Sequence, residues 1–441
     1  MLIKIKRKIK RELCEITRKL FDISHITEIE NELFYLYQQN IELERQIRNL
    51  DKERKISVVF VCYEPGSWDS LKTVCEACMC DNAFDVTIVT IPLIKQMSKR
   101  KGDEHSVYED SRAEEYFRNY PCRVINGFDH DTKKWFDMKT LEPDYLFFQD
   151  PYDIHRPEEY QIKEVSKYTH VCFIHYGCSI IGGEVFHAVH PYSFMEKVSY
   201  IFSENMEKQY YYESMLLSPL NRRQKILNLG FPRWDNFNEK MQRTNLFWKH
   251  DRGERTRIIW LPRWSTVEKN CNFFDYKDRL FEFVESSEIF ELLFRPHPLT
   301  FANFMATGEM SEQEVGEMQE KYWSADNCAI DGEGDFWKAF ASTDIIMADA
   351  TSLLADAFLT EKPIIYCHKE KDSWTEFAEH LYEGFYVANC WHDVQRILRQ
   401  LQSGDDPLLE TRRKIIKEHY RIPKEGAGVL IKEYLKEEFK K

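Results

Sequence analysis

Short, continuous apolar runs alternate with amphipathic stretches through most of this chain. The runs at 56–62 and 84–90 are rich in β-branched residues, as buried parallel strands are. Further apolar runs end at Gln149, His175 and Ser203, and a turn or helical pattern follows each of them. The run at 198–203 is predicted to be the last strand of the first sheet, and residues 210–228 are predicted to be helical. This alternation predicts a doubly wound α/β sheet in the first half of the chain.

The same alternation resumes near Gly230. Strands are predicted there at 257–261, 290–294, 344–348 and 363–367, with helical stretches between them. A chain of 441 residues is too long for one ordinary core. We therefore predict two Rossmann-like domains, 53–229 and 230–441, with charged helices at the carboxyl end of the second.

Residues 1–52 form a separate, helical extension in this interpretation. Residues 1–21 are basic, with an apolar stripe at Ile9, Leu13, Ile16 and Leu20. Such a helix can lie on an anionic membrane, where each Lys or Arg contributes about 1 kcal/mol. The alternative is a packing helix whose basic face is solvated.

A heptad pattern follows the basic segment. The apolar stripe alternates three- and four-residue steps between residues 26 and 50, through Ile26, Ile29, Leu33, Leu36, Asn40, Leu43, Ile47 and Leu50. A polar residue at an a-type position, here Asn40, is typical of a register-specific parallel dimer. We predict a two-stranded coiled coil and homodimer, with the alternative of one helix lying back on its own domain.

Composition excludes several classes of function. The net charge of −13 argues against nucleic acid as the main partner. No apolar run reaches about 18 residues and no signal-peptide pattern opens the chain, so we expect a cytoplasmic protein, peripheral on the inner face of the membrane if residues 1–21 bind lipid. Cys75, Cys78 and Cys80 lack a second ligand pair for zinc and are interpreted as small buried residues of a core helix.

Two segments of the second half carry candidate chemistry. In the first, an apolar run to Phe294 leads directly into Arg295 and a proline-flanked His297. In the second, Thr351 and Ser352 stand between a predicted strand and a short helix. Backbone N–H groups and hydroxyls at such a turn suit a phosphate, although a Thr-Ser pair is more often a helix cap. Their occurrence in one βα domain favours a site at the carboxyl edge of its sheet.

These segments resemble the CDP-glycerol glycerophosphotransferase family, the polymerases and primases of teichoic-acid-like polymers. Members carry Arg-x-His-Pro after a strand, here 295–298, and Asp-Tyr-Ser-Ser, here 349–352. Their Gly-Tyr-Pro-Arg-Asn-Asp is matched by 230–235. The resemblance covers roughly residues 225 to 435, about half of the chain.

The sequence also departs from the family pattern. Ala350 and Thr351 replace the Tyr and first Ser of Asp-Tyr-Ser-Ser, and the Arg of Pro-Thr-Trp-Arg is shifted to Arg263. The family's Trp-His-Gly-Thr-Pro-Leu-Lys has its nearest counterpart around His175, where Thr-Pro-Leu-Lys is missing.

The resemblance implies a GT-B architecture, in which two Rossmann-like domains face a cleft. It implies transfer of glycerol- or ribitol-phosphate from a CDP-linked donor to a hydroxyl of a polymer or lipid-linked acceptor, in the synthesis of teichoic acid or capsule. The implied donor-binding residues are Arg295, Thr351, Ser352, Asp356, Arg263 and Arg233, with Asp356 facing the ribose or polyol. The implied catalytic residues are His175, which takes the acceptor proton, and His297, which helps to neutralise the leaving phosphate. We expect neither a metal nor a cofactor.

Two alternatives remain open at the level of sequence. One is a GT-B glycosyltransferase that uses a nucleotide-sugar for a surface polysaccharide. The other is a non-catalytic assembly protein in which the coiled coil is the working part.

Overall fold

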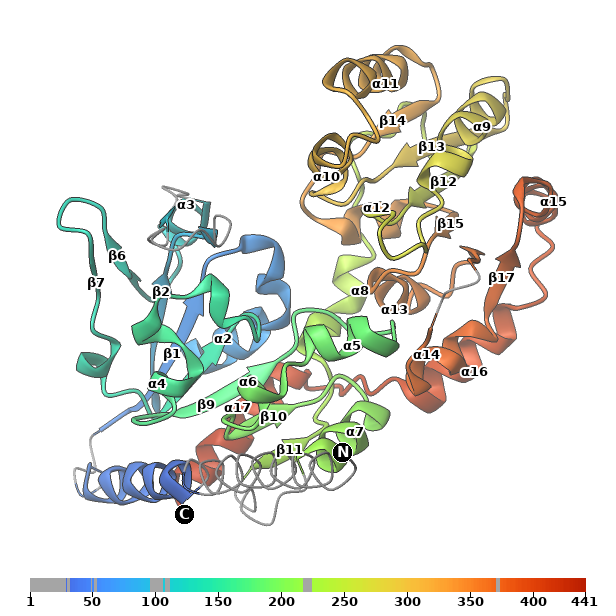
Figure 1. The fold of residues 1–441 in the computed structure, drawn as a ribbon. Helices are drawn as coiled ribbons and strands as arrows, with labels where there is room; N and C mark the ends of the chain where they lie inside the picture. The colour runs from blue at the N-terminus through green and yellow to red at the C-terminus, as the bar shows by residue number, and fades with distance from the viewer. Residues whose placement is uncertain are drawn as a thin grey trace, which may run out of the picture.

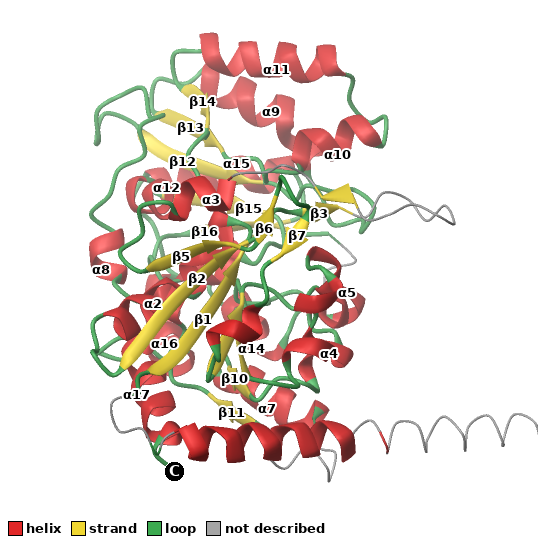
Figure 2. Ribbon diagram, turned by 90° about the vertical axis from the view of Figure 1, so that its left-hand side faces the viewer, coloured by secondary structure: helices red, strands yellow, loops and turns green. Residues whose placement is uncertain are grey.

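The computed structural model consists of two α/β lobes joined at one side (Figure 1). It describes residues 29, 32–48, 50, 54–95, 106–107, 112–216, 224–369 and 373–441. The two main sheets have seven and six strands, and neighbouring strands in both are parallel. Helices lie on both faces of the sheets (Figure 2). The prediction of a two-domain, doubly wound α/β fold is therefore confirmed.

The first sheet has the strand order β11-β10-β9-β8-β1-β2-β5. Its strands are β1 (Ile56–Cys62), β2 (Phe84–Thr90), β5 (Arg123–Asn126), β8 (Tyr145–Phe148), β9 (His170–Ile174), β10 (Tyr200–Phe202) and β11 (Lys225–Leu227). Its main helices are α2 (Lys72–Met79), α3 (Arg112–Phe117), α4 (Ile162–Val165), α5 (Gly183–Val189), α6 (Tyr192–Met195) and α7 (Met206–Met215). Two short hairpins are formed by β3 (Ile94–Lys95) with β4 (Ser106–Val107), and by β6 (Phe128–Asp129) with β7 (Lys134–Trp135).

Two expectations for the end of the first domain are wrong. The sequence pattern predicts a helix over 210–228 and makes the run at 198–203 the last strand. In the structure α7 ends at Met215, and β11 adds a further strand beside β10. The three-residue β11 at the sheet edge is too short to produce a recognisable alternation.

The second sheet has the strand order β14-β13-β12-β15-β16-β17. Its strands are β12 (Thr256–Leu261), β13 (Phe290–Phe294), β14 (Cys328–Ile330), β15 (Ile345–Ala348), β16 (Ile364–Cys367) and β17 (Phe385–Ala388). The helices are α8 (Phe237–Lys240), α9 (Phe273–Glu285), α10 (Thr300–Ala306), α11 (Glu312–Ser324), α12 (Phe336–Ser342), α13 (Leu353–Phe358), α14 (Glu376–Tyr382), α15 (Trp391–Gln402) and α16 (Leu409–His419). The four predicted strands are present, whereas the edge strands β14 and β17 were not predicted.

The last helix, α17 (Ala427–Phe439), returns to the first domain and packs against α2. Gly428 makes this contact close, since a Cβ atom there would lie 2.4 Å from the carbonyl carbon of Thr73. The carboxylate of Asp235 accepts hydrogen bonds from the backbone N–H groups of Ala427 and Gly428, at 2.7 and 2.9 Å. Asp235 thus caps α17 from the segment that links the two sheets.

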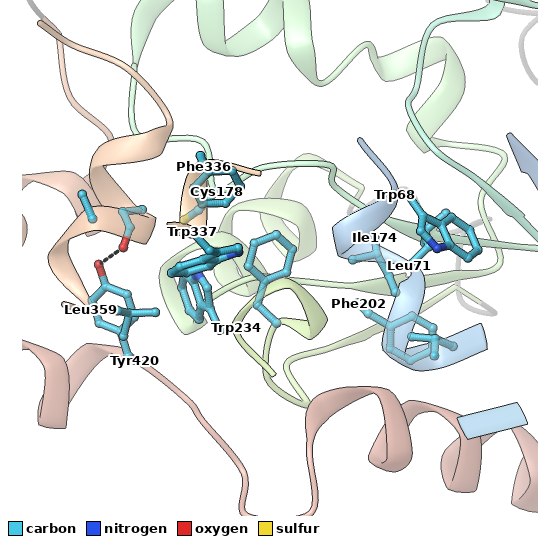
Figure 3. Close-up of a cluster of buried hydrophobic side chains, with 14 of the residues drawn as sticks. Trp68, Leu71, Ile174, Cys178, Phe202, Trp234, Phe336, Trp337, Leu359 and Tyr420 are labelled. Atoms are coloured by element: carbon cyan, nitrogen blue, oxygen red, sulfur yellow. Dashed lines mark hydrogen bonds between the residues drawn. The ribbon is translucent and has the colours of Figure 1, made fainter. Parts of the chain in front are cut away.

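A single apolar cluster extends across the junction between the domains (Figure 3). It includes Trp68 and Phe202 from the first domain, Trp234 from the linking segment, and Trp337 and Tyr420 from the second domain. All five side chains are buried. The domains therefore share part of their core where the chain crosses between them.

The helical residues 32–48 lie along the first domain beside the end of α17 (Figure 1). Gln38 donates to the carbonyl of Ser166 at 3.0 Å, and Arg45 donates to the carbonyl of Glu438 at 3.1 Å. The alternative in which this helix lies back on its own domain is thus realised for residues 32–48. The heptad stripe faces away from the domain, and six of its members are 46–81% exposed: Ile29, Leu33, Leu36, Leu43, Ile47 and Leu50.

Two further expectations concern the membrane and the cysteines. The basic segment 1–21 lies outside the described residues, and no helix among those described is long and apolar enough to cross a membrane. Cys75 and Cys78 are buried on α2, as predicted, whereas Cys80 is exposed just beyond the end of that helix.

Candidate functional site

Thr351 and Ser352 occupy the turn between β15 and α13, so the predicted strand–turn–helix unit is confirmed. Both residues are partly exposed at the carboxyl edge of the sheet. Ser352 is the residue before α13, but its side chain makes no capping hydrogen bond. The Ser352 hydroxyl is therefore not committed to the helix end.

Arg263 supports this turn from the end of the neighbouring strand β12. Its backbone N–H donates to Asp349 at 2.8 Å, and its guanidinium donates to the carbonyl of Ala350 at 2.8 Å. Glu268 balances the charge of Arg263 through an ion pair. The turn that carries the two hydroxyls is thus held by a buried cation at its base.

His297 lies on the same side of the second domain as Arg263. Its ring stacks on that of Trp264, with centroids 5.8 Å apart. His297 is exposed as a residue, but partial desolvation of its ring, together with the charge of Arg263, lowers its pKa to about 4. The imidazole is therefore neutral at neutral pH. Its Nδ1 accepts a hydrogen bond from the backbone N–H of Leu299 at 3.2 Å, which leaves Nε2–H as the group able to donate to a ligand.

Arg295 is engaged by a different loop. It forms an ion pair with Asp331 and donates to the carbonyls of Glu333 and Gly334, at 2.9 and 3.2 Å. The structure places Arg295 and Thr351 on the same sheet edge, but no hydrogen bond joins their side chains. Asp331 follows β14, the strand beside β13, so the partner of Arg295 comes from a segment 36 residues away in the sequence.

His175 follows β9 at the carboxyl edge of the first sheet and is 3% exposed. Its Nδ1 lies 2.6 Å from the carbonyl oxygen of Gly177. Its Nε2 is buried and has no hydrogen-bond partner among the described residues. Burial lowers the pKa of His175, so the ring is neutral at neutral pH and retains a nitrogen able to take a proton.

The loop after His175 meets the hydroxyl turn of the second domain. A Cβ atom on Gly177 would lie only 3.7 Å from the Ser352 hydroxyl oxygen. Arg233 strengthens the contact, because it donates to the carbonyl of Tyr176 at 2.9 Å and to Asp356 at 3.0 Å. The structure thus brings the loop of His175, Arg233 and the turn at Ser352 together between the two domains.

Asp356 is fully buried, and both of its carboxylate oxygens are bonded. One accepts from Arg233, and the other accepts from the indole N–H of Trp234 at 2.9 Å. In this arrangement Asp356 holds Arg233 in place and does not face open space.

A buried polar cluster beside His175 was missed at the level of sequence. It comprises His190, Glu204 and Lys208. Nε2 of His190, both carboxylate oxygens of Glu204 and Nζ of Lys208 have no hydrogen-bond partner in the described part of the chain. The rings of His175 and His190 stack with centroids 4.8 Å apart, and burial lowers the pKa of Lys208 to about 8. The signal was available, because Glu204 follows β10 at the same sheet edge as His175.

Comparisons with known proteins identify similarity of structure only. No family model matches the chain, and no curated protein matches it in sequence. A structure of the wall teichoic acid polymerase TagF matches with a TM-score of 0.54 and 14% identity, over 93% of this chain and 98% of that one. A TagF structure soaked with CDPG gives a TM-score of 0.53, at the same identity and coverage.

A second kind of enzyme has a similar structure. A protein from Listeria monocytogenes, described as a UDP-N-acetylglucosamine 2-epimerase, matches with a TM-score of 0.51 and 11% identity, over 81% of this chain and 91% of that one. Identities this low establish the fold and not an activity. The chain thus has the two-domain, GT-B-like fold shared by a teichoic acid polymerase and this epimerase, as the sequence motifs led us to expect.

Proposed function

We propose that this protein transfers a polyol-phosphate, glycerol- or ribitol-phosphate, from a CDP-linked donor to a hydroxyl of a polymer or lipid-linked acceptor in bacterial surface-polymer synthesis. The observation that carries the proposal is the meeting of the His175 loop with the Ser352 turn between two GT-B-like domains. A proton acceptor on one domain and phosphate-binding hydroxyls on the other are the parts that phosphoryl transfer needs.

The donor would bind to the second domain. Thr351 and Ser352 would donate hydroxyl hydrogen bonds to its phosphates, while Arg263 stabilises the turn from below. His297 is neutral at neutral pH and could donate to an oxygen of the leaving phosphate. Arg295 would contribute only if the donor displaced one of its carbonyl partners, Glu333 or Gly334.

The acceptor would bind to the first domain. In the proposed reaction the acceptor hydroxyl loses its proton to Nε2 of His175 as its oxygen attacks the phosphorus next to the polyol. Because this nitrogen is buried in the structure, the loop after His175 would have to shift for the acceptor to reach it. The bond between that phosphorus and the pyrophosphate bridging oxygen breaks, and CMP leaves. The chain's own contribution is to orient both groups and to stabilise the charge on the leaving phosphate.

Binding and product analysis test this proposal. Calorimetry should show binding of CDP-glycerol or CDP-ribitol, weakened at least about tenfold by a Thr351→Val, Ser352→Ala variant that loses two charge-assisted hydrogen bonds. The product should gain the mass of glycerol-phosphate or ribitol-phosphate. Binding of neither donor, or equal binding by the variant, would reject it.

A nucleotide-sugar enzyme is the second candidate, supported by the structural similarity to the epimerase. It would bind UDP-N-acetylglucosamine in the same calorimetric experiment and would transfer or alter a sugar. A non-catalytic assembly protein would bind none of these nucleotides.

The enzyme would act as a dimer held through the heptad stripe predicted for residues 26–50. The helix binds its own domain through Gln38 and Arg45, which lie opposite that stripe. The exposed Leu36 and Leu43 therefore remain available to the same residues of a second copy.

We propose further that residues 1–21 attach this dimer to the inner face of the cell membrane. Sedimentation with vesicles that contain phosphatidylserine should retain the full chain and not a chain that begins at residue 22, and binding should fall as salt increases. Equal sedimentation of both chains would contradict the attachment.

A further inference from the structure

Three side chains that suit a transition-metal ion converge where α7, α14 and α16 meet. They are Glu207 in the first turn of α7, His380 in α14, and His419 at the end of α16. One ligand atom from each lies within 4.8 Å of the other two. Glu207 belongs to the first domain, and the two histidines belong to the second domain.

The two imidazoles point at the same carboxylate oxygen. Nδ1 of His419 lies 2.9 Å from Oε1 of Glu207, and Nε2 of His380 lies 3.9 Å from that atom. The rings stack face to face with centroids 3.8 Å apart. The other oxygen of Glu207 is buried and has no hydrogen-bond partner among the described residues.

An ordinary charge-assisted hydrogen bond explains the contact between Glu207 and His419. It does not account for the second imidazole, whose Nε2 lies 3.9 Å from the same carboxylate oxygen and so makes no hydrogen bond to it. A shared divalent cation would use one nitrogen from each ring and would also engage the idle carboxylate oxygen. Ligand atoms around one zinc ion lie about 3.3 Å apart, so small side-chain rotations suffice to close the site.

We propose that Glu207, His380 and His419 bind one divalent transition-metal ion and that Zn²⁺ is the ion that suits these ligands best. The bound ion would link the two domains. Two imidazoles and a carboxylate form a ligand set that suits Zn²⁺, and the partly exposed His380 leaves room for water as the fourth ligand. The expectation of no metal concerned the reaction, in which this ion would take no part. The inference is therefore independent of the proposed activity.

Calorimetry with Zn²⁺ alone tests the site on the full, tag-free chain. A Cys80→Ser, Cys390→Ser background removes the two exposed thiols among the described residues that could bind zinc instead. We expect one ion per chain and a rise in Tm of about 3 °C at a hundredfold excess over Kd. Each of His380→Ala, His419→Ala and Glu207→Gln should weaken binding at least about tenfold.

The matched control is His392→Ala, because His392 is an exposed histidine of α15 in the same domain. It should bind Zn²⁺ as tightly as the parent. Co²⁺ gives a second readout, because three nitrogen and oxygen ligands with water produce a tetrahedral visible spectrum that should vanish in His419→Ala. Absence of saturable binding would overturn the proposal, and so would binding that the three ligand substitutions leave unchanged.

Discussion

At the scale of single residues, the contact between Arg233 and Asp356 shows how the chain can keep a buried charge near the candidate site. Arg233 and Asp356 are 6% and 0% exposed, respectively, and each would be costly to bury alone. Their hydrogen bond joins the linking segment to α13, and the carbonyl of Tyr176 takes another guanidinium N–H. The pair fixes the position of the His175 loop relative to Ser352.

Replacing Asp356 by Ala should therefore lower the free energy of unfolding by about 3 kcal/mol, since it leaves the Arg233 charge buried without a carboxylate. Asp356→Asn keeps an oxygen acceptor and should cost less. Urea denaturation measures both values. As a control, Lys163→Ala removes an ion pair with Glu158 in which the two side chains are 48% and 77% exposed, and it should change stability little. Equal effects of Asp356→Ala and Lys163→Ala would contradict the assignment.

The lowered pKa of His175 gives a prediction for activity against pH. Because the ring stays neutral below its ordinary pKa of 6.5, activity should remain on its plateau down to pH 6.5 and fall only at lower pH. His175→Asn should reduce kcat about 100-fold or more, with its circular dichroism unchanged. Loss of activity with an apparent pKa above 6.5 would exclude His175 as the base.

The same shift predicts the sign of a stability effect. Below pH 6.5 the unfolded chain protonates His175 while the folded chain does not, so folding stability contributed by this site is lost as pH falls. His175→Asn should therefore have a shallower decline of unfolding free energy below pH 6.5. A decline as steep as that of the parent would show that other groups cause it.

The sequence predicts the local secondary structure around the candidate residues, but not the distant residues that their side chains contact. The strand–turn–helix geometry that places Thr351 and Ser352 follows from local patterning and was predicted correctly. Side-chain direction depends on partners distant in sequence, such as Asp331 for Arg295 and Trp234 for Asp356, and no local pattern contains them.

At the scale of elements, the helix over residues 32–48 has two working faces. One face binds the domain mostly through polar groups such as Gln38 and Arg45, and the other carries the apolar heptad stripe. Periodicity of apolar residues reveals only the second face. The sequence therefore predicted a coiled coil or a docked helix as alternatives, whereas the structure allows one helix to do both.

A Leu36→Asp, Leu43→Asp variant tests the dimer that we propose. Both side chains are more than half exposed in one chain, at 56% and 58%, so the change should leave the fold intact and convert a dimer to a monomer. Light scattering after size-exclusion chromatography measures the mass. Leu246→Asp is the matched control, because Leu246 is 81% exposed elsewhere and should not affect the mass. A parent protein that is monomeric at micromolar concentration would end this proposal.

At the scale of the whole molecule, α17 determines how the halves are joined. The helix follows the second domain in sequence and packs on the first, with Gly428 in contact with the backbone of Thr73. The sequence showed a charged terminal helix but could not show its docking partner, because Gly428 stands in the small and apolar run 426–431 and nothing in that run identifies Thr73 as the residue it contacts.

Gly428→Ala should lower the free energy of unfolding by about 2 kcal/mol, because the new Cβ atom meets backbone atoms that cannot move aside cheaply. Gly316→Ala is the control. Gly316 lies within α11 with open space around it, so alanine there should raise stability by about 0.5–1 kcal/mol. Denaturation by urea should give opposite signs for the two variants, and a stabilising Gly428→Ala would contradict the packing described.

The two crossings between the domains lie against each other. A Cβ atom on Gly230 would lie 2.7 Å from Cδ of Pro423, and Arg421 donates to the carbonyl of Asn228 at 2.5 Å. The second sheet is thus inserted in the sequence between β11 and α17, which both belong to the first domain. The segments that lead into and out of this insertion lie side by side. Any proteolytic cut within the insertion would put β1–β11 and α17 on separate fragments, which should co-purify under native conditions and part only in denaturant.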